Sequence, residues 1–433
     1  MMRLVYPVIL FLALPLVWLR LQWRSRREPE YGQRQGERFG RVPETVRRGP
    51  VWFHTVSAGE TIAAAPMIAA LAERHSDVPF LVTTMTPTGS QQVVDRLGRL
   101  VDHCYAPYDF GFGVRRFFDR VAPRLLVLME TELWPNLIGE AYARGVPVLL
   151  VNARLSQRSA NGYARLGALA DRMLGQVDLI ACQTVDHRLR FEALGAPRVE
   201  VVGSVKFDLT LPRDFASNGA RLARRLGTQE ETVWIAASTH PGEDEIVLEA
   251  FARVRETHPE LKLVLVPRHP VRGADVGALA ESAGYTVSYQ SVLSPEDGRE
   301  GGSEGPVRAT DVIVGDVMGT LLSLYGLADV AFVGGSFVEV GGHNPIEPAL
   351  CGVPAISGPH QFNFTDVMEA LEHVGSLVTV SDAAALAVQI LIWLDDPRAA
   401  EAAGAAGLGV IEANRGAQAR ITQLIEERLS GMA

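Results

Sequence analysis

The sequence predicts an α/β fold with two Rossmann-like domains, and three observations support this prediction. From residue 50 onward, short apolar runs alternate with helical patterns, as in right-handed βαβ units with parallel sheets. A polar, proline-containing stretch at 206–216 interrupts the pattern, which then starts again. The length of 433 residues suits two domains of roughly 100–200 residues each. We therefore expect two parallel sheets, covered by helices on both faces, that face a central cleft.

The expected strands are short apolar runs bounded by polar residues or glycine. In the first half they cover 51–56, 79–84, 124–129, 146–152, 179–182 and 199–203. In the second half they cover 233–238, 261–267, 311–315, 328–335 and 353–358. Helix-like stretches such as 61–74 and 160–175 separate them, and 291–309 reads as a surface loop. Ligands of this architecture bind at the carboxyl ends of strands, so the loops that follow the strands are where a site is expected.

The domain boundaries follow from the same pattern. We expect one domain over 25–210 and a second over 211–410, preceded by an N-terminal segment over 1–24. The alanine-rich tail is expected to be helical. Its last helix, within 411–433, is expected to pack back across the domain interface.

The N-terminal segment is strongly apolar. Between Arg3 and Arg20 lie 16 uncharged, mostly apolar residues, which span about 24 Å as a helix and fall short of the ~20 residues that a bilayer span needs. A signal peptide is the alternative, but no small-residue cleavage site follows. Trp18 and Trp23 beside arginines suit the membrane interface. We expect a membrane-anchor helix, either shallow or barely spanning, with the body of the protein on the cytoplasmic side.

Charge and cysteine content exclude several classes of function. The net charge is −9, yet residues 1–48 hold ten arginines and four glutamates, or +6, so the remainder carries −15. A basic N-terminal region on an otherwise acidic protein indicates that this region alone contacts an anionic surface. This charge distribution argues against nucleic-acid binding. Cys104, Cys182 and Cys351 have no metal-ligand spacing and are odd in number, which fits a reducing compartment. We expect no metal and no cofactor.

Three polar loops follow expected strands of the second domain, at 238–245, 267–270 and 334–347. Together they supply small hydroxyls, the bidentate donor Arg268, histidines, and glycines that allow close approach. That set fits a phosphodiester and sugar hydroxyls. Neither a G-x-G-x-x-G after the first strand nor a G-x-x-x-x-G-K-[ST] occurs, which argues against a Rossmann oxidoreductase and a P-loop NTPase.

The stretch GGHNPIEPAL (341–350) has two interpretations. In the structural one, Asn344 is a helix N-cap, Pro345 the first helical residue and Glu347 the reciprocal partner of a capping box. In the functional one, backbone N–H groups at a helix N-terminus hold an anion and Glu347 accepts from a ribose diol. Both can hold in one protein.

The first domain has its own polar loop after its first strand, HTVSAGETIAAAPMI (54–68). Glu60 opens a helix there, either as a favourable charge at the helix N-terminus or as a general base that this N-terminus keeps ionised. Glu130 and Glu132 follow another strand. They either orient that base or bind substrate, or else belong to a solvated loop.

These loops are similar to those of the 3-deoxy-D-manno-octulosonic acid (Kdo) transferases of lipopolysaccharide synthesis. The resemblance rests on YGQRQGERFG, HTVSAGE, TTMTPTG, METELWPN, VNARLS, GSVKFD, PRHP and GGSFVEVGGHNPIEPA, in this order over nearly the whole chain. It implies the two-domain GT-B fold and an inverting transferase. Such an enzyme moves Kdo from CMP-Kdo to the 6′-hydroxyl of a tetraacylated lipid A precursor, lipid IVA, and releases CMP. The implied location is the cytoplasmic face of the inner membrane of a Gram-negative-type bacterium.

The resemblance also implies roles for particular residues. Glu60 is the expected catalytic base, with Glu130 and Lys206 near the reacting sugar. The residues expected around the donor are Ser238, Thr239, Arg268, His269, Gly341, Gly342, Asn344 and Glu347. The turn with Met318 and Gly319 should also lie near the donor. Thr320 departs from the glutamate usual at its position, which weakens any role assigned to that turn.

Two rival functions remain. One is another membrane-associated GT-B transferase that uses a UDP-sugar and a lipid-linked acceptor. The other is a non-catalytic scaffold that keeps a vestigial nucleotide pocket. A sugar-nucleotide epimerase shares the fold but has no need of a lipid anchor.

Overall fold

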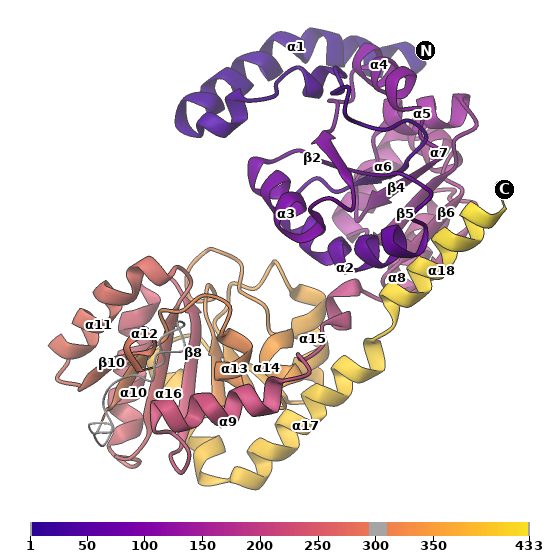
Figure 1. The fold of residues 1–433 in the computed structure, drawn as a ribbon. Helices are drawn as coiled ribbons and strands as arrows, with labels where there is room; N and C mark the ends of the chain where they lie inside the picture. Colours follow the sequence, from indigo (N-terminus) through magenta and orange to yellow (C-terminus); the bar gives the residue numbers. More distant parts are fainter. Residues whose placement is uncertain (1, 294–309, 432–433) are drawn as a thin grey trace. The chain divides into compact units, whose positions relative to one another are not determined.

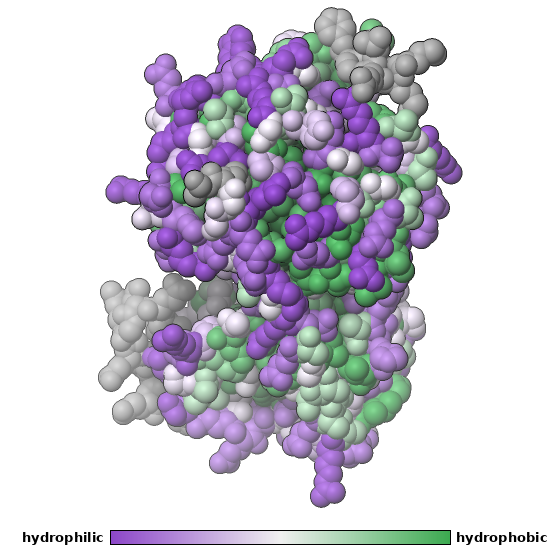
Figure 2. Space-filling view, turned by 90° about the vertical axis from the view of Figure 1, so that its right-hand side faces the viewer, coloured by the Kyte–Doolittle hydropathy of each residue, from purple (hydrophilic) through white to green (hydrophobic). Residues whose placement is uncertain are grey.

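The computed structural model describes residues 2–293 and 310–431, which form two compact units. The first unit comprises Met1–Asp208 and Asn414–Ala433, and the second comprises Leu209–Ala413. On the face drawn in Figure 2, hydrophilic side chains occupy most protruding positions and hydrophobic ones show as patches between them.

The first unit, drawn in indigo to magenta with α18 in yellow in Figure 1, is built on a parallel sheet. The sheet has seven strands in the order β3-β2-β1-β4-β5-β6-β7. Its strands are β1 (Val51–His54), β2 (Phe80–Thr84), β3 (Asp102–Tyr105), β4 (Leu125–Met129), β5 (Val148–Ala153), β6 (Leu179–Cys182) and β7 (Val199–Val201). Its α-helices are α1 (Met2–Arg27), α2 (Ala58–Arg74), α3 (Pro87–Leu97), α4 (Gly111–Val121), α5 (Pro135–Ala143), α6 (Gln157–Leu166), α7 (Ala168–Leu174), α8 (Val185–Ala193) and α18 (Ala417–Ser430). The 3₁₀ turns are η1 (Pro29–Gly32), η2 (Glu37–Phe39) and η3 (Val205–Asp208).

The central strands are mostly apolar, with polar residues such as His54 and Asn152 toward their carboxyl ends, because helices cover both faces of the sheet. Along β1, the side chain of Trp52 packs with α4, α5, α7 and α8, whereas Val51 and Phe53 pack with α2, α3 and α18 on the other face. All three side chains are fully buried. This is why the sequence shows continuous apolar runs without the alternation of a half-exposed strand.

The C-terminal helix α18 is part of the first unit. Ile421 and Ile425 are fully buried in the same core cluster as β1. The carboxylate of Asp208 accepts from the backbone N–H groups of Gly416 and Gln418 at 2.5 and 2.6 Å, which fixes the start of α18 to η3. This C-terminal helix packs on the sheet of the first unit.

The second unit contains another seven-stranded parallel sheet, of order β10-β11-β9-β8-β12-β13-β14. Its strands are β8 (Val233–Thr239), β9 (Lys262–Pro267), β10 (Val287–Tyr289), β11 (Val312–Val314), β12 (Val330–Val333), β13 (Ala355–Ser357) and β14 (Leu377–Thr379). Its helices are α9 (Phe215–Leu226), α10 (Glu243–Arg255), α11 (Gly273–Ser282), α12 (Gln290–Leu293), α13 (Leu321–Tyr325), α14 (Ile346–Leu350), α15 (Thr365–His373), α16 (Ala383–Asp395) and α17 (Pro397–Asn414), with the turn η4 (Pro270–Arg272).

Sequence patterning missed three strands, β3, β10 and β14, and all three lie at sheet edges. An edge strand has one free side and is less covered, so its residues are only partly apolar. The burial of β10 is partial at all three positions, and β14 is half-exposed. Short strands of this kind lack the apolar run by which the central strands were recognised.

Two further expectations are corrected. The helical stretch expected at 160–175 consists of α6 and α7, which Gly167 separates with a φ of +50°. Residues 291–293 of the expected surface loop belong to α12, and the rest of that loop, 294–309, lies outside the described residues.

The N-terminal apolar segment is helical throughout α1. Within the described part of the chain, none of the helices has the length and apolar character needed to span a lipid bilayer.

Candidate active site

The acidic candidate residues of the first unit lie at the switch point of its sheet. β1 and β4 are neighbours in the sheet although β2 and β3 lie between them in the chain, so the loops that follow β1 and β4 diverge from a shared crevice. In open parallel sheets, ligands bind in that crevice, outside the carboxyl ends of the strands. Glu60 follows β1, and Glu130 and Glu132 follow β4.

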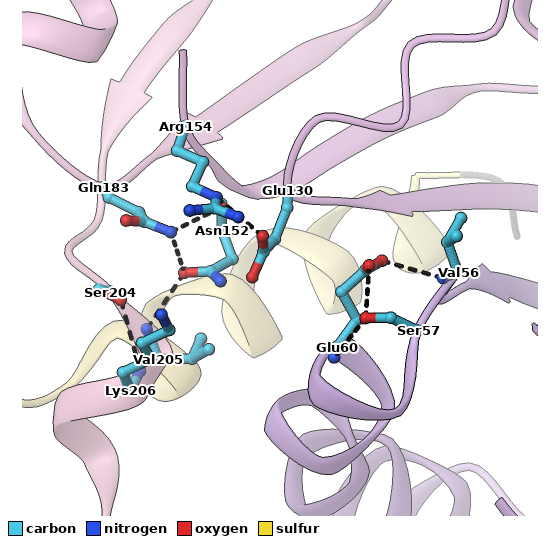
Figure 3. Close-up of polar contacts among 10 residues, drawn as sticks. All are labelled: Val56, Ser57, Glu60, Glu130, Asn152, Arg154, Gln183, Ser204, Val205 and Lys206. Carbon is cyan, nitrogen blue, oxygen red and sulfur yellow. Dashed lines mark hydrogen bonds and ion pairs between the residues drawn. The ribbon is translucent and has the colours of Figure 1, made fainter. Parts of the chain in front are cut away.

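Glu60 is held by the start of its own helix. Ser57 is the N-cap of α2, and its hydroxyl accepts from the backbone N–H of Glu60 at 3.3 Å. The same hydroxyl donates to the Glu60 carboxylate at 2.9 Å, and the N–H of Val56 donates to the other carboxylate oxygen at 2.9 Å (Figure 3). The Glu60 side chain is thereby fixed in the first turn of α2, where the residue is only 8% exposed.

Burial raises the pKa of Glu60 to about 7. The hydrogen bonds from Val56 and Ser57 lower this pKa, and the negative charges of Glu132 and Glu130 raise it. The expectation that the helix N-terminus keeps this carboxylate ionised is therefore wrong in direction, because loss of water outweighs the local donors. A carboxyl with a pKa near neutral pH is a better general base than one with an ordinary pKa, since it binds a proton more strongly while a large fraction stays ionised.

The two acids that follow β4 have different partners. Glu130 has a φ of +52°, and its carboxylate accepts from the Arg154 guanidinium at 2.8 Å. Glu132 accepts from the indole N–H of Trp134 at 2.8 Å, and burial raises the pKa of Glu132. Because both carboxylates have hydrogen-bond partners, these two acids do not belong to a freely solvated loop.

Asn152 and Gln183 extend the site and were not assigned from the sequence. Both are at least nine-tenths buried at the carboxyl ends of β5 and β6. Gln183 donates to the backbone carbonyl and the side-chain oxygen of Asn152 at 3.0 and 3.1 Å. The Asn152 side-chain oxygen also accepts from the N–H of Val205 at 3.2 Å, in the turn that carries the half-buried Lys206. The signal available in the sequence was their place directly at strand ends.

The amide nitrogen of Asn152 has no hydrogen-bond partner among the residues that the structure describes. Asn152 is fully buried and has a φ of +50°. In Figure 3 its amide lies between Gln183 and Glu130, with the nitrogen on the side of Glu130. A buried donor without a partner, held in a strained backbone conformation, is a common feature of functional sites.

The second unit repeats this arrangement around β8 and β12. These strands are neighbours in the sheet, while β9, β10 and β11 lie between them in the chain, so this is the switch point of the second sheet. The carboxyl end of β8 consists of the half-buried Ser238, with a φ of +61°, and Thr239. Thr239 is fully buried and donates to Asp244 at 2.6 Å, so its side chain stabilises the loop.

Glu243 organises both loops of this switch point and was also missed. Its fully buried carboxylate accepts from the N–H groups of Gly335, Ser336 and Phe337 at 2.7–2.9 Å, and from that of His240 at 2.9 Å. Gly334 lets the two loops approach, because a Cβ there would lie 2.7 Å from the carbonyl oxygen of Ser238. Glu243 looked in the sequence like an ordinary acid in the first turn of a helix.

Arg268 and His269 follow β9, next to β8 in the sheet, and both are exposed. The backbone N–H of Arg268 donates to the carbonyl of Thr239 at 3.0 Å. Met318 and Gly319 follow β11, at the same edge but one strand farther from the switch point. Met318 is 69% exposed.

The glycine-histidine-asparagine stretch is only partly as expected. The helix that follows, α14, starts at Ile346 and has five residues, so its dipole is weak. Asn344 accepts from the N–H of Ile346 at 3.2 Å, but Glu347 meets the side-chain amide of Asn344 at 3.2 Å and not a backbone N–H. The capping box is therefore incomplete. Burial raises the pKa of Glu347, against the effects of Asn344 and Arg268.

Gly341 and Gly342 precede this stretch with φ angles of +98° and +77°. Only glycine adopts such angles without strain. The backbone therefore turns sharply beside the short helix, in the loop that follows β12.

Comparison with known proteins agrees with this architecture. Residues 33–209 match the family described as 3-deoxy-D-manno-octulosonic-acid transferase (kdotransferase), and 309–408 match glycosyl transferases group 1. The chain is 38% identical to the 3-deoxy-D-manno-octulosonic acid transferase of Haemophilus influenzae, over 99% of both chains. The chain belongs to the 3-deoxy-D-manno-octulosonic acid transferase family. The Bordetella pertussis Kdo transferase is 36% identical, over 98% of this chain and 99% of that one.

Family membership identifies the protein as a glycosyltransferase that transfers Kdo. The UDP-GlcNAc 2-epimerase of Neisseria meningitidis, at 13% identity, has a similar fold with a TM-score of 0.54, covering 89% of this chain and 100% of that one. This likeness concerns the fold alone. It confirms the expected GT-B-like architecture of two parallel-sheet α/β domains. No group of three or more metal-ligating side chains occurs in the described ranges of this Kdo transferase.

Proposed function

We propose that this Kdo transferase moves Kdo from CMP-Kdo to the 6′-hydroxyl of a tetraacylated lipid A precursor, lipid IVA, with inversion at the anomeric carbon and release of CMP. The observation that carries this proposal is Glu60: a carboxyl with a pKa of about 7, fixed by Ser57 and Val56 at the switch point of its sheet. A sugar hydroxyl needs such a base in order to attack, and the family's reaction has a hydroxyl acceptor.

The switch point of the second unit is proposed to hold the donor. Arg268 and His269 would meet the phosphate, and the left-handed turn at Gly341 and Gly342 lets it approach the backbone closely. Glu347 would accept from the ribose hydroxyls.

The proposed donor site includes further residues of the second unit. Ser238 supplies a small hydroxyl at a position with positive φ, and Thr239 and Asn344 have side chains that stabilise their loops. Met318 and Gly319 form an exposed turn.

The proposed chemistry is a single displacement. Glu60 takes the proton of the acceptor hydroxyl, whose oxygen forms a bond to C2 of Kdo while the C2–O bond to the CMP phosphate breaks with its electron pair going to the phosphate oxygen. Arg268 stabilises the charge that CMP gains. Lys206 and Glu130 would lie beside the reacting sugar, where an ammonium group can pair with the Kdo carboxylate. We expect the step to need neither a metal nor a cofactor, and unchanged turnover in a chelator would support this.

The acceptor is a lipid, and α1 has a surface suited to a membrane. Leu12, Leu16, Leu19 and Trp23 lie at helical spacing along one stripe and are between 52% and 69% exposed. The exposed arginines 20, 24 and 27 lie along the adjacent stripe. We propose that α1 lies in the cytoplasmic leaflet of the inner membrane as an interfacial helix, with its arginines on anionic headgroups.

One hydrogen bond near the start of this helix connects it to the body of the first unit. The hydroxyl of Tyr6 donates to Asp109 at 2.8 Å, and Asp109 also accepts from the N–H groups of Asn136 and Leu137 at the start of α5. This contact holds the proposed membrane-binding helix against the body of the first unit.

The test is an assay of the purified enzyme with CMP-Kdo and the tetraacylated precursor in mixed micelles, with products resolved by mass. We expect a product heavier by one or more Kdo residues and an equivalent amount of CMP. Glu60→Gln should lower kcat by about 10²–10⁴-fold, whereas Glu73→Gln, an exposed position on the same helix, should not. Transfer from a UDP-sugar, or full activity of Glu60→Gln, would contradict the proposal.

A further inference from the structure

Two histidines meet across the switch point of the second sheet. His240 lies in the loop after β8 and His343 in the loop after β12. Their Nε2 atoms are 2.8 Å apart, and the rings are nearly parallel, with an interplanar angle of 6°. The pair therefore spans the crevice in which the phosphate of the donor is proposed to bind.

Proton counting limits the states of this pair. At 2.8 Å the two Nε2 atoms share a hydrogen bond, so one of them carries a proton and the other presents its lone pair. A further proton can enter only at the Nδ1 atom of the donor ring, which makes the pair a single cation. A second added proton would put two N–H groups face to face and break the contact. The pair therefore binds one additional proton and no more.

The surroundings keep this proton away in the free protein. Burial, and to a smaller extent the positive charge of Arg268, lower the pKa of both histidines, that of His343 to about 4. His269 acts in the same direction on both, and Arg272 on His240. Glu243 is the acid that opposes this for His240, but its carboxylate already accepts from four backbone N–H groups.

We propose that His240 and His343 act as one proton-binding site that becomes charged when the phosphate of the nucleotide donor enters, and that this cation then stabilises the departing CMP. This inference rests on the proposed function of the second unit. A bound phosphate places a negative charge beside the two histidines and the positive charges around them. The free-energy cost of protonating the pair therefore falls when the donor binds. When the C2–O bond breaks, the electron pair moves to the phosphate oxygen, which then lies beside a cation.

The sign of the pH dependence follows from linkage. Bound phosphate raises the pKa of the pair above its value in the free protein. The added affinity is therefore complete below the free-state pKa and is lost as pH rises through the bound-state pKa. Between the two values, affinity for the nucleotide rises by at most about tenfold per unit decrease in pH, because a single proton is taken up.

The test is calorimetric titration of the full chain with the methyl phosphodiester of CMP, whose phosphate does not titrate near neutral pH. Measurements in two buffers of different ionisation enthalpy give the number of protons taken up. We expect an uptake above zero and at most one, increasing as pH falls from neutral. Binding without uptake overturns the inference but leaves the proposed nucleotide site intact, whereas absence of binding overturns both.

Variants assign the proton to the pair. His240→Gln and His343→Gln should each abolish uptake and weaken binding at mildly acidic pH. His258→Gln, in the same unit but paired with Asp395, should leave both unchanged. If a pair variant does not fold, nitrogen NMR of the wild-type imidazoles decides: nucleotide should protonate both Nδ1 atoms, and unchanged tautomers would refute the proposal.

Discussion

The hydroxyl of Ser57 donates to the carboxylate of Glu60 at 2.9 Å while it accepts from the backbone N–H of the same residue. The Ser57 hydroxyl thus caps the helix and also fixes the position of the carboxylate. Because the carboxylate is also buried, its charge is costly, and its pKa reaches about 7. Activity of the transferase should report directly on this balance.

The value of kcat/KM should rise with pH and reach half of its plateau near neutral pH. A base must be ionised in order to accept a proton, and Glu60, whose pKa is raised to about 7, is protonated below that pH. A pH–rate profile with saturating lipid acceptor and limiting donor measures this limb. A limb near the ordinary glutamate pKa would show that Glu60 is not the group that titrates.

Two substitutions should move this limb in opposite directions. Ser57→Ala removes a hydrogen bond that lowers the pKa of Glu60, so the limb should shift to higher pH; Glu132→Gln removes a negative charge that raises it, so the limb should shift to lower pH. Each shift should be about half a unit to one unit, where one unit corresponds to about 1.4 kcal/mol. Ser57→Ala should also cost about 1 kcal/mol of stability through the lost cap. Shifts of the same sign would contradict this account.

Asn152→Gly should separate the effect of the Asn152 side chain on activity from the effect of its strained backbone. Glycine tolerates the φ of +50°, so the variant removes only the contacts to Gln183 and Val205 and the unpartnered amide. We expect a loss of kcat of about tenfold and of about 1–3 kcal/mol in the free energy of unfolding, because the Val205 N–H loses its acceptor. Asn161→Gly, at an exposed position, is a control for kcat only, since glycine weakens α6. Unaltered turnover by Asn152→Gly would assign Asn152 a purely structural role.

Glu243→Gln should loosen the loops around β8 and β12. In the wild type, the backbone N–H groups are shared between the two oxygens of the Glu243 carboxylate, whereas the amide of the variant offers only one oxygen. We therefore expect a loss of about 2–3 kcal/mol in the free energy of unfolding. Hydrogen exchange of the Gly335, Ser336 and Phe337 amides measures the effect locally. Glu245→Gln, an exposed acid on the same helix, is the matched control. Retained protection of these amides would show that Glu243 does not hold the loop.

The stripe on α1 should govern binding to anionic vesicles. Replacing Leu16 and Trp23 by glutamate should lower the bound fraction at least tenfold, since each buried apolar side chain contributes roughly 1.5–3 kcal/mol. Co-sedimentation with vesicles of phosphatidylglycerol and phosphatidylethanolamine measures this, and salt should weaken binding further. Leu189→Glu, an exposed position on α8, serves as the control. Equal binding of all variants would place the membrane contact elsewhere.

The amino-acid sequence by itself determined the two-sheet α/β architecture, because buried central strands need continuous apolar runs and these are visible without partners. It also placed Glu60, Glu130 and Arg268 in loops after strands, where such folds bind ligands. The sequence did not reveal the edge strands. β10 and β14 are short and half-exposed, and their pairing depends on a neighbouring strand that only the fold supplies.

Only the tertiary structure decided which polar groups meet and how they are charged. Asn152 and Val205 are 53 positions apart, and His240 and His343 are 103 positions apart, so no local pattern could pair them. The pKa of Glu60 was misjudged from the helix N-terminus alone. Dehydration of a carboxylate depends on every element packed around it, and that enclosure exists only once the chain has folded.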